Sequence, residues 1–175
     1  MENTEKIKFQ AVNIAIMTVS DSRTFEDDRS GTTLIKRLEK AGHFLADRAI
    51  IKDEVELITE KLRKWIESPD IDAVITTGGT GVTGRDVTPE ALAQVWEKDI
   101  PGFGELFRWI SYKNIKTSAL QSRACAGVAN GTYLFALPGS TGACKDGWDE
   151  ILVHQLDYRF TPCNFVELMP RLQEK

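Results

Sequence analysis

The residues of this chain best suited to chemistry lie in one glycine-rich stretch. The apolar run Ala73–Thr77 is followed by Gly78-Gly79-Thr80-Gly81, and Arg85 and Asp86 come a few residues later. Three glycines in four residues allow successive backbone N–H groups to turn inward and form a concavity for a phosphate or a similar acceptor. Arg85 could hold a negatively charged group, and Asp86 could hold a cation. Taken alone, the stretch could equally be a tight turn between a buried strand and its crossover helix.

Two other turns follow apolar runs in the same way. Ser20 and Asp21 come directly after the run 12–19, and Pro138-Gly139-Ser140 comes after the run 133–137. Ligands of open α/β sheets bind outside the carboxyl ends of the strands, so we expect all three turns to open on one edge and form a site together. The serine of the last turn could bind a phosphate or cap the following helix, because both roles use the same geometry.

The elements that must position these turns follow from the hydrophobic periodicity. Strand patterns lie at 12–19, 43–51, 73–77 and 133–137. Helical patterns run from Ser30 to Gly42, from Asp53 to before Pro69, from Thr88 to a break at Pro101-Gly102, over 103–110, and after Gly142. Ser30 and Thr88 are expected to be N-caps. Strands that alternate with helices predict an α/β domain whose mostly parallel sheet is covered on both faces.

Length and composition predict one globular domain over 1–175, with a polar lead at 1–10 and an irregular C-terminal wrap at 161–175. The formal net charge of -4 and the pI near 5.3 argue against a broad nucleic-acid-binding surface, which needs an excess of Lys and Arg. No apolar run approaches the roughly 20 residues of a membrane helix, and the N-terminus lacks a signal-peptide core.

The cysteines and histidines do not predict a metal site. Cys125, Cys144 and Cys163 are widely spaced and odd in number, so we expect reduced thiols and a cytoplasmic location. His43 and His154 have no cysteine near them in the sequence, and we expect both to be partly exposed structural residues.

Four sequence blocks carry a resemblance to a known family. They are Thr76-Thr77-Gly78-Gly79-Thr80-Gly81, Arg85-Asp86-Val87-Thr88-Pro89-Glu90-Ala91, Pro101-Gly102-Phe103-Gly104-Glu105 and Leu137-Pro138-Gly139-Ser140, in that order. On these blocks, and from about Ile14 to about Phe165, the chain resembles the MoaB/Mog family of molybdenum cofactor biosynthesis proteins, which bind molybdopterin. The segments 122–124, 126–130 and 161–165 look like the B-type branch rather than the Mog branch.

The resemblance implies a three-layer αβα domain that assembles into trimers, and B-type members often pair two trimers into a hexamer. It also implies an activity, because competent members adenylylate molybdopterin with Mg-ATP and release pyrophosphate. The two aspartates that matter in that chemistry match Asp53 and Asp86 of this chain. Some B-type members carry glutamate at the first position, whereas this chain keeps both aspartates.

The implied reaction joins two anions, because the terminal phosphate of molybdopterin attacks the α-phosphate of ATP. A Mg²⁺ ion held by carboxylates reduces their repulsion. We therefore expect Asp86 and Asp53 to be the catalytic and metal-binding residues. Either could instead be structural: Asp53 as a carboxylate at a helix N-terminus, and Asp86 as the cap of its loop.

The other candidates would bind the substrates. Gly78–Gly81 would line the pterin or nucleotide pocket with N–H groups, beside Arg85, and Pro138-Gly139-Ser140 would bind the molybdopterin phosphate. Ser20 and Asp21 could bind the edge of the pterin or of the nucleotide. The expected partners are molybdopterin, ATP and further copies of the chain, with no nucleic acid and no membrane.

Other functions are weighed against this one. The chain could hold molybdopterin and pass it on without catalysis, which the B-type segments favour and the aspartate pair disfavours. A generic NTPase or a serine hydrolase is less supported, because the sequence contains neither Gly-x-x-x-x-Gly-Lys-Ser/Thr nor Gly-x-Ser-x-Gly. Phe103, Phe107 and Trp109 are expected in the core or at a subunit contact.

Overall fold

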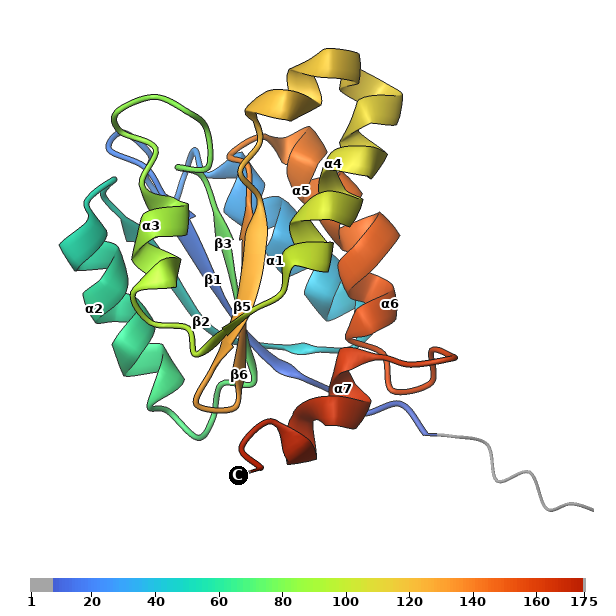
Figure 1. The fold of residues 1–175 in the computed structure, drawn as a ribbon. Coiled ribbons are helices and arrows are strands. Elements are labelled where there is room, and N and C mark those ends of the chain that lie inside the picture. The colour runs from blue at the N-terminus through green and yellow to red at the C-terminus, as the bar shows by residue number, and fades with distance from the viewer. Residues whose placement is uncertain (1–7, 175) are drawn as a thin grey trace, which may run out of the picture.

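A six-stranded sheet forms the centre of the molecule in a computed structural model that describes residues 8–174 (Figure 1). Its strands are β1 Asn13–Val19, β2 Phe44–Ile51, β3 Ala73–Thr77, β4 Lys98–Asp99, β5 Cys125–Ala129 and β6 Thr132–Leu137. Their spatial order is β2-β1-β3-β6-β5-β4. The first four strands of that order are parallel, and β5 is antiparallel to both of its neighbours. The predicted α/β fold with a mostly parallel sheet is confirmed.

Helices lie on both faces of the sheet (Figure 1). They are α1 Arg29–Ala41, α2 Val55–Ile66, α3 Thr88–Ala93, α4 Pro101–Ile115, α5 Thr141–Gly147, α6 Val153–Gln155 and α7 Phe165–Leu168. The 3-10 turns η1 Lys116–Gln121 and η3 Met169–Arg171 follow α4 and α7, and the π-helical turn η2 Trp148–Leu152 joins α5 to α6.

Alternate residues of β1 contact different layers of helices. Ile14 and Ile16 belong to a buried cluster with residues of α1, α4, α5 and η2. Ala15 and Met17 belong to a second cluster with residues of α2 and α3. Successive side chains of a strand point to opposite faces, so the two clusters lie on the two sides of one sheet. This is the three-layer αβα arrangement that the family resemblance implies.

The sequence does not predict β4 and β5. β5 is a run of Ala, Gly, Cys and one Val, and it lacks the aromatic and multiple β-branched residues typical of a strand. Gly127 of this strand lies where a side chain would not fit, because a Cβ there would be 2.6 Å from the Trp96 ring and 2.8 Å from the Lys98 carbonyl oxygen. β4 has only two residues, which is too short to produce a pattern.

Several helices begin at residues other than those predicted. The N-cap of α1 is Asp28 rather than Ser30, and its carboxylate accepts from the Gly31 N–H at 2.9 Å. The N-cap of α3 is Val87, so Thr88 is the first helical residue instead of the cap. Pro101 does not break a helix but begins α4, at a position where its missing N–H costs nothing.

Two further expectations are corrected. His43 is buried rather than partly exposed, and its Nδ1 accepts from the Val12 N–H at 3.1 Å. The 161–175 segment is not irregular throughout, because Asn164 caps α7 by accepting from the Glu167 N–H at 2.8 Å. Most of the polar lead at 1–10 lies outside the described residues. Among residues 8–174, no helix combines the length and the apolar character needed to cross a membrane.

Candidate functional site

The three predicted turns meet at the carboxyl edge of the parallel strands, at the top of Figure 1. The N–H of Gly78, directly after β3, donates to the Leu137 carbonyl at the end of β6 at 3.0 Å. The hydroxyl of Ser30, at the start of α1, donates to the Gly139 carbonyl at 2.8 Å. These bonds tie the turn after β6 to β3 and to the helix that follows β1, so one edge of the sheet carries all three turns.

The glycine loop, defined here as Gly78–Gly81, packs where a side chain would not fit. Gly78 has a φ of +104°, and a Cβ there would lie 2.2 Å from the Val19 carbonyl oxygen. Gly79 has a φ of +65°, and a Cβ there would lie 2.4 Å from the Thr88 hydroxyl oxygen. Both residues need the left-handed backbone that glycine tolerates. The glycines therefore allow β1 and α3 to approach the loop closely.

All four carbonyl groups of the glycine loop accept hydrogen bonds from the protein. The Thr88 hydroxyl and N–H donate to the first and second carbonyls, at 2.8 and 2.9 Å. The Arg123 N–H and Nε donate to the third and fourth, at 2.9 and 2.6 Å. In a trans peptide the C=O and N–H groups point in opposite directions. The N–H groups of Gly79 and Thr80 therefore point away from these donors, and within residues 8–174 neither has a protein acceptor.

A cavity of about 370 Å³ lies beside the glycine loop. The loop lines it together with Asp86 and Pro138-Gly139-Ser140. The other lining residues come mainly from α4, η1 and the residue after it: Phe107, Ser111, Ile115, Ser118, Gln121 and Ser122, with Ala143 of α5. The volume lies in the range of small-molecule sites, and the lining joins apolar surface to a few polar groups.

Asp86 lines this cavity and also closes its own loop. Its Oδ2 accepts from the Thr83 N–H at 2.9 Å and from the Thr83 hydroxyl at 2.6 Å. The Thr83 hydroxyl, with smaller contributions from backbone N–H groups and the charge of Arg123, holds the pKa of the Asp86 carboxyl below its usual value. Asp86 therefore does cap its own loop, and the same hydrogen bonds keep its carboxylate ionised and fixed in position beside the cavity.

Asp53, Asp21 and Arg85 form a charged cluster that contacts the glycine loop but does not line the cavity. Arg85 donates to both carboxylate oxygens of Asp21 at 2.8–3.0 Å. The Asp21 carboxylate also accepts from the Asp53 N–H at 3.3 Å. A Cβ at Gly79 would lie 3.2 Å from Asp53 Oδ1, so the carboxylate of Asp53 lies against the loop.

The carboxylates of this region influence one another. Burial, followed by the negative charge of Asp21, raises the pKa of the Asp53 carboxyl above its usual value, and the charge of Asp86 acts in the same direction. The hydrogen bonds from Arg85 lower the pKa of Asp21. Positive charge also reaches these carboxylates from Lys52, near Asp21, and from Arg123, near Asp86.

Within residues 8–174, no three His, Cys, Asp or Glu side chains are placed to hold a metal ion by themselves. Mg²⁺ is usually bound by one or two carboxylates, water and the phosphates of a substrate. Asp53 and Asp86 supply oxygen donors of this kind, so they could hold Mg²⁺ together with a phosphorylated ligand.

The hydroxyls of Ser20 and Ser140 bond within their own turns. Ser20 Oγ accepts from the N–H groups of Ser22 and Arg23, each at 3.2 Å, and Ser20 does not line the cavity. Ser140 lines the cavity and caps α5, because its Oγ accepts from the Ala143 N–H at 3.1 Å. The helix-cap interpretation of Ser140 is confirmed, and its role toward a phosphate stays a prediction.

Sequence reasoning missed Arg123 and the bonding role of Thr88 at this site. The only signal for Arg123 was its place in a segment that looks like the B-type branch, and a lone arginine has no local pattern that reveals its partners. Thr88 was interpreted as a helix cap, although its hydroxyl is buried against the glycine loop. Phe107 is buried as expected but also lines the cavity, and Trp109 is 61% exposed.

Comparison with known proteins agrees with this arrangement. A family model described as "Probable molybdopterin binding domain" matches residues 15–158. Molybdenum cofactor biosynthesis protein B of Escherichia coli (strain K12) is 49% identical over 90% of this chain and 93% of its own length. The protein of the same name from Bacillus subtilis (strain 168) is 42% identical over 83% of this chain and 86% of its own length.

Solved structures are similar over most of the chain as well. A crystal structure of molybdenum cofactor biosynthesis protein B has a TM-score of 0.85 and 37% identity, and covers 95% of this chain and 98% of its own. The tungsten cofactor synthesizing protein MoaB from Pyrococcus furiosus has a TM-score of 0.73 and 34% identity over 82% of this chain and 91% of its own. The chain belongs to the MoaB/Mog family of molybdenum cofactor biosynthesis proteins.

Proposed function

We propose that this chain binds molybdopterin and adenylylates it with Mg-ATP, giving adenylylated molybdopterin and pyrophosphate. The observation that carries this proposal is the orientation of the glycine loop. Thr88 and Arg123 occupy its carbonyls, so the N–H groups of Gly79 and Thr80 are available to a ligand. A row of fixed N–H donors suits the ring acceptors of a pterin or the oxygens of a phosphate. The description of the matching family supports molybdopterin as the ligand.

The cavity lining also suits a flat heterocycle with a polar edge. Phe107 and Ile115 contribute apolar surface, and Ser118 and Gln121 contribute groups that can donate or accept hydrogen bonds. Heterocyclic ligands are commonly held by apolar walls and a small number of placed polar groups.

In the proposed transfer, a phosphate oxygen of molybdopterin bonds to the α-phosphorus of ATP, and the bond from that phosphorus to pyrophosphate breaks. The reaction needs no protein nucleophile, because holding two reactants in line lowers the barrier by itself. Asp53 and Asp86 would hold Mg²⁺, which when bound supplies positive charge against the triphosphate. Arg85 would add a second positive charge near the same phosphates.

A second candidate is molybdopterin binding without catalysis. It is favoured by the state of Asp86, whose Oδ2 already accepts two hydrogen bonds from Thr83. The described residues also lack a group of three metal ligands. Under this alternative the carboxylates would only shape the loop that binds the pterin.

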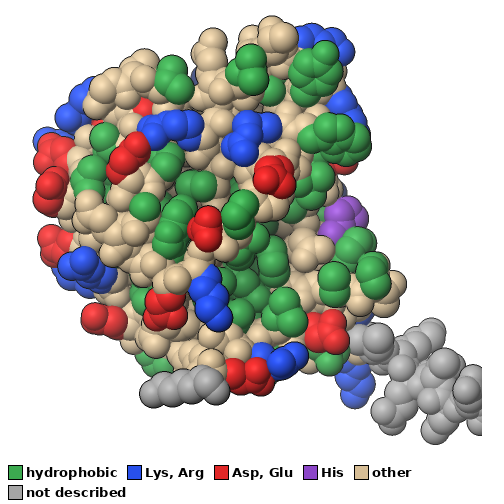
Figure 2. All heavy atoms as spheres, in the orientation of Figure 1, with side chains coloured by type: hydrophobic (Ala, Val, Ile, Leu, Met, Phe, Trp, Pro, Cys, Tyr) green, Lys and Arg blue, Asp and Glu red, His purple; other side chains and the backbone are tan. Residues whose placement is uncertain are grey.

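We also propose that the chain self-associates as a trimer or as a pair of trimers. Large apolar side chains of α4 and η1 are exposed: Leu106, Trp109, Tyr112, Ile115 and Leu120. Figure 2 shows further hydrophobic side chains gathered around β5, between α3 and α4. Exposed apolar surface of this extent is typical of an interaction site. Light scattering should give a mass of three or six times 19.6 kDa, and a monomer would contradict the proposal.

The test of function is AMP transfer by the purified chain. Incubation with molybdopterin and ATP should release pyrophosphate and form adenylylated molybdopterin when Mg²⁺ is present, and chelation of the metal should stop both. Tight molybdopterin binding with no AMP transfer at any Mg²⁺ concentration would decide for the binding function.

A further inference from the structure

Arg123 holds both ends of the loop that carries Asp86. Its Nε donates to the Gly81 carbonyl at 2.6 Å, and its Nη2 donates to the Asp86 carbonyl, also at 2.6 Å. These carbonyls belong to the first and last residues of the segment 81–86. One planar guanidinium therefore sets the distance between the two ends of this loop, which a flexible lysine ammonium would not do.

The third nitrogen of the Arg123 guanidinium also has a partner. Its Nη1 pairs with Glu90, in the first turn of α3. The side chain of Arg123 is only 34% exposed, so water competes less for its donors than at a fully exposed ion pair. The base of the loop is thus connected to α3 and to the segment that enters β5.

A second arginine holds the backbone around Arg123. Nη1 of Arg108, on α4, donates to the Ser122 carbonyl at 3.4 Å and to the Ala124 carbonyl at 3.2 Å. These carbonyls flank Arg123 in the sequence. The contacts therefore run from α4 through the segment 122–124 to the loop 81–86.

A second contact of this loop is more exposed than that of Arg123. Arg85, next to Asp86, bonds Asp21, but its side chain is 59% exposed and that of Asp21 is 46% exposed. Ion pairs at such exposure contribute little to keeping a loop in place. Thr83 closes the loop on itself, and Arg123 is the less exposed of the two arginines that connect it to the rest of the protein.

We propose that Arg123 is a positioning residue for Asp86, supported by Arg108, and that neither arginine touches the substrates. Neither of them lines the cavity beside the glycine loop. The backbone N–H of Arg123 also bonds the Thr80 carbonyl, while its side chain bonds the Gly81 carbonyl, so this one residue ties the end of the glycine loop to the base of the loop that carries Asp86. The effect on turnover rests on the proposed adenylyl transfer, whereas the effect on loop order does not.

The kinetic test compares Arg123→Ala and Arg123→Lys with Arg171→Ala, a control at an exposed arginine paired with Glu174 far from the site. We expect kcat of Arg123→Ala to fall roughly 100-fold, the scale associated with a small misplacement of a reacting group. KM for ATP should change by less than about threefold, because uniform substrate binding is retained. Added guanidinium at millimolar concentration should restore part of the rate of Arg123→Ala and leave Arg171→Ala unchanged.

A raised KM with unchanged kcat would instead identify Arg123 as a substrate ligand and overturn the proposal.

Hydrogen exchange gives a readout that does not need catalysis. The amides of Thr83, Asp86 and Thr88, which are hydrogen-bonded in and beside this loop, should exchange faster in Arg123→Ala and recover with guanidinium, while core strands keep their protection. Equal protection in both proteins would overturn the proposal. If Arg123→Ala does not fold, the same measurement on Arg123→Lys tests the proposal. The lysine ammonium cannot bridge both carbonyls, so the same amides should lose protection. A wild-type chain that transfers no AMP would refute the proposed function, and hydrogen exchange would still test whether Arg123 positions the loop.

Discussion

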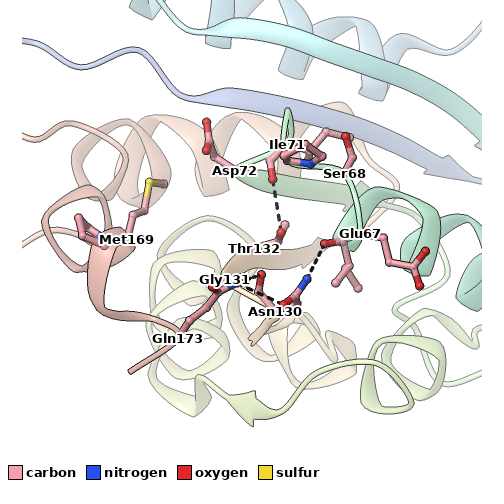
Figure 3. Close-up of a pocket in the computed structure, with 12 residues that line it drawn as sticks. Glu67, Ser68, Ile71, Asp72, Asn130, Gly131, Thr132, Met169 and Gln173 are labelled. Carbon is pink, nitrogen blue, oxygen red and sulfur yellow. Dashed lines mark hydrogen bonds between the residues drawn. The ribbon is translucent and has the colours of Figure 1, made fainter. Parts of the chain in front are cut away.

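The two edges of the sheet each carry a cavity, and the larger one is not the candidate site. The cavity at the carboxyl edge has about 370 Å³, and a cavity of about 430 Å³ lies at the amino edge, between the start of β3, the turn joining β5 to β6, and η3 (Figure 3). Both are open to solvent and both have mixed linings, so size and composition do not separate them.

The difference lies in what the polar groups bind. At the amino edge they bond one another, as Figure 3 shows: the Gln173 amide donates to the Asn130 carbonyl at 2.8 Å, and the Thr132 hydroxyl donates to the Ile71 carbonyl at 3.3 Å. At the carboxyl edge, the N–H groups of Gly79 and Thr80 have no acceptor among residues 8–174. Oriented donors without a protein partner, rather than volume, distinguish a binding site.

The largest expected effect separates two aspartates, one from each edge. Asp86→Asn keeps an oxygen that can accept from Thr83 but loses the charge, so AMP transfer should fall by roughly 10²–10³-fold. Asp72→Asn, at the amino edge, removes the charge from a carboxylate that accepts from the N–H and side chain of Asn13, and transfer should be unchanged. Rates measured at saturating Mg-ATP check this. Full activity of Asp86→Asn would remove the carboxylate mechanism.

Two glycines with positive φ sharpen the contrast. Gly79 has a φ of +65° and Gly131, at the amino edge, a φ of +82°. Alanine at either position should cost about 1–3 kcal/mol of unfolding free energy, since both would be strained. Only Gly79→Ala should also lose transfer and molybdopterin binding, because its Cβ would displace Thr88, whereas the nearest atom to a Cβ at Gly131 is the flexible end of Gln173 at 2.9 Å. Denaturant titration and a binding assay on both variants measure the two effects separately.

A smaller effect is expected from Gln173→Ala. It removes the hydrogen bonds from this amide to Asn130, which should lower the free energy of unfolding by about 0.5–1.5 kcal/mol. Molybdopterin affinity and turnover should not change. Weaker molybdopterin binding in this variant would show that the amino-edge cavity belongs to the site, and the comparison of the edges would fail.

The smallest predicted effect concerns pH and again differs between the edges. Burial lowers the pKa of His43, next to β2 at the amino edge, below its usual value. The unfolded chain therefore binds the proton more tightly, and stability is lost as pH falls below the unfolded pKa of about 6.5. Urea titrations at pH 7.5 and 5.5 should show a smaller loss for His43→Gln than for the wild type. An equal loss in both proteins would exclude His43 as the source.

Hydrophobic periodicity was sufficient to predict four strands and the edge where the turns meet. β1, β3 and β6 are continuous apolar runs because both of their faces are buried, and such runs are visible in a sequence. The convergence of Gly78, Asp86 and Ser140 then followed from the rule that parallel strands end at one edge.

The missing parts depend on contacts between distant residues. The bonds from Arg123 to Gly81 and Asp86 span about forty positions, and no local pattern marks Arg123 as the partner of these two residues. Asp28 was overlooked as a cap because Ser30 is an equally good candidate by type, and only packing against Thr18 and Arg48 selects between them. β5 lacked the side chains typical of strands, so its place in the sheet could not be inferred.

That unpredicted strand has a topological consequence. In a wholly parallel sheet every strand begins at the amino edge, so each connection must cross back from the carboxyl edge, usually through a helix. β5 runs the other way, with Cys125 opposite Ala136, so the chain must enter it from the same rim where β3 and β6 finish. The reversal brings η1 and Ser122 to that rim, where they form one wall of the cavity. A single change of strand direction thus adds a wall to a cavity that stays open to solvent.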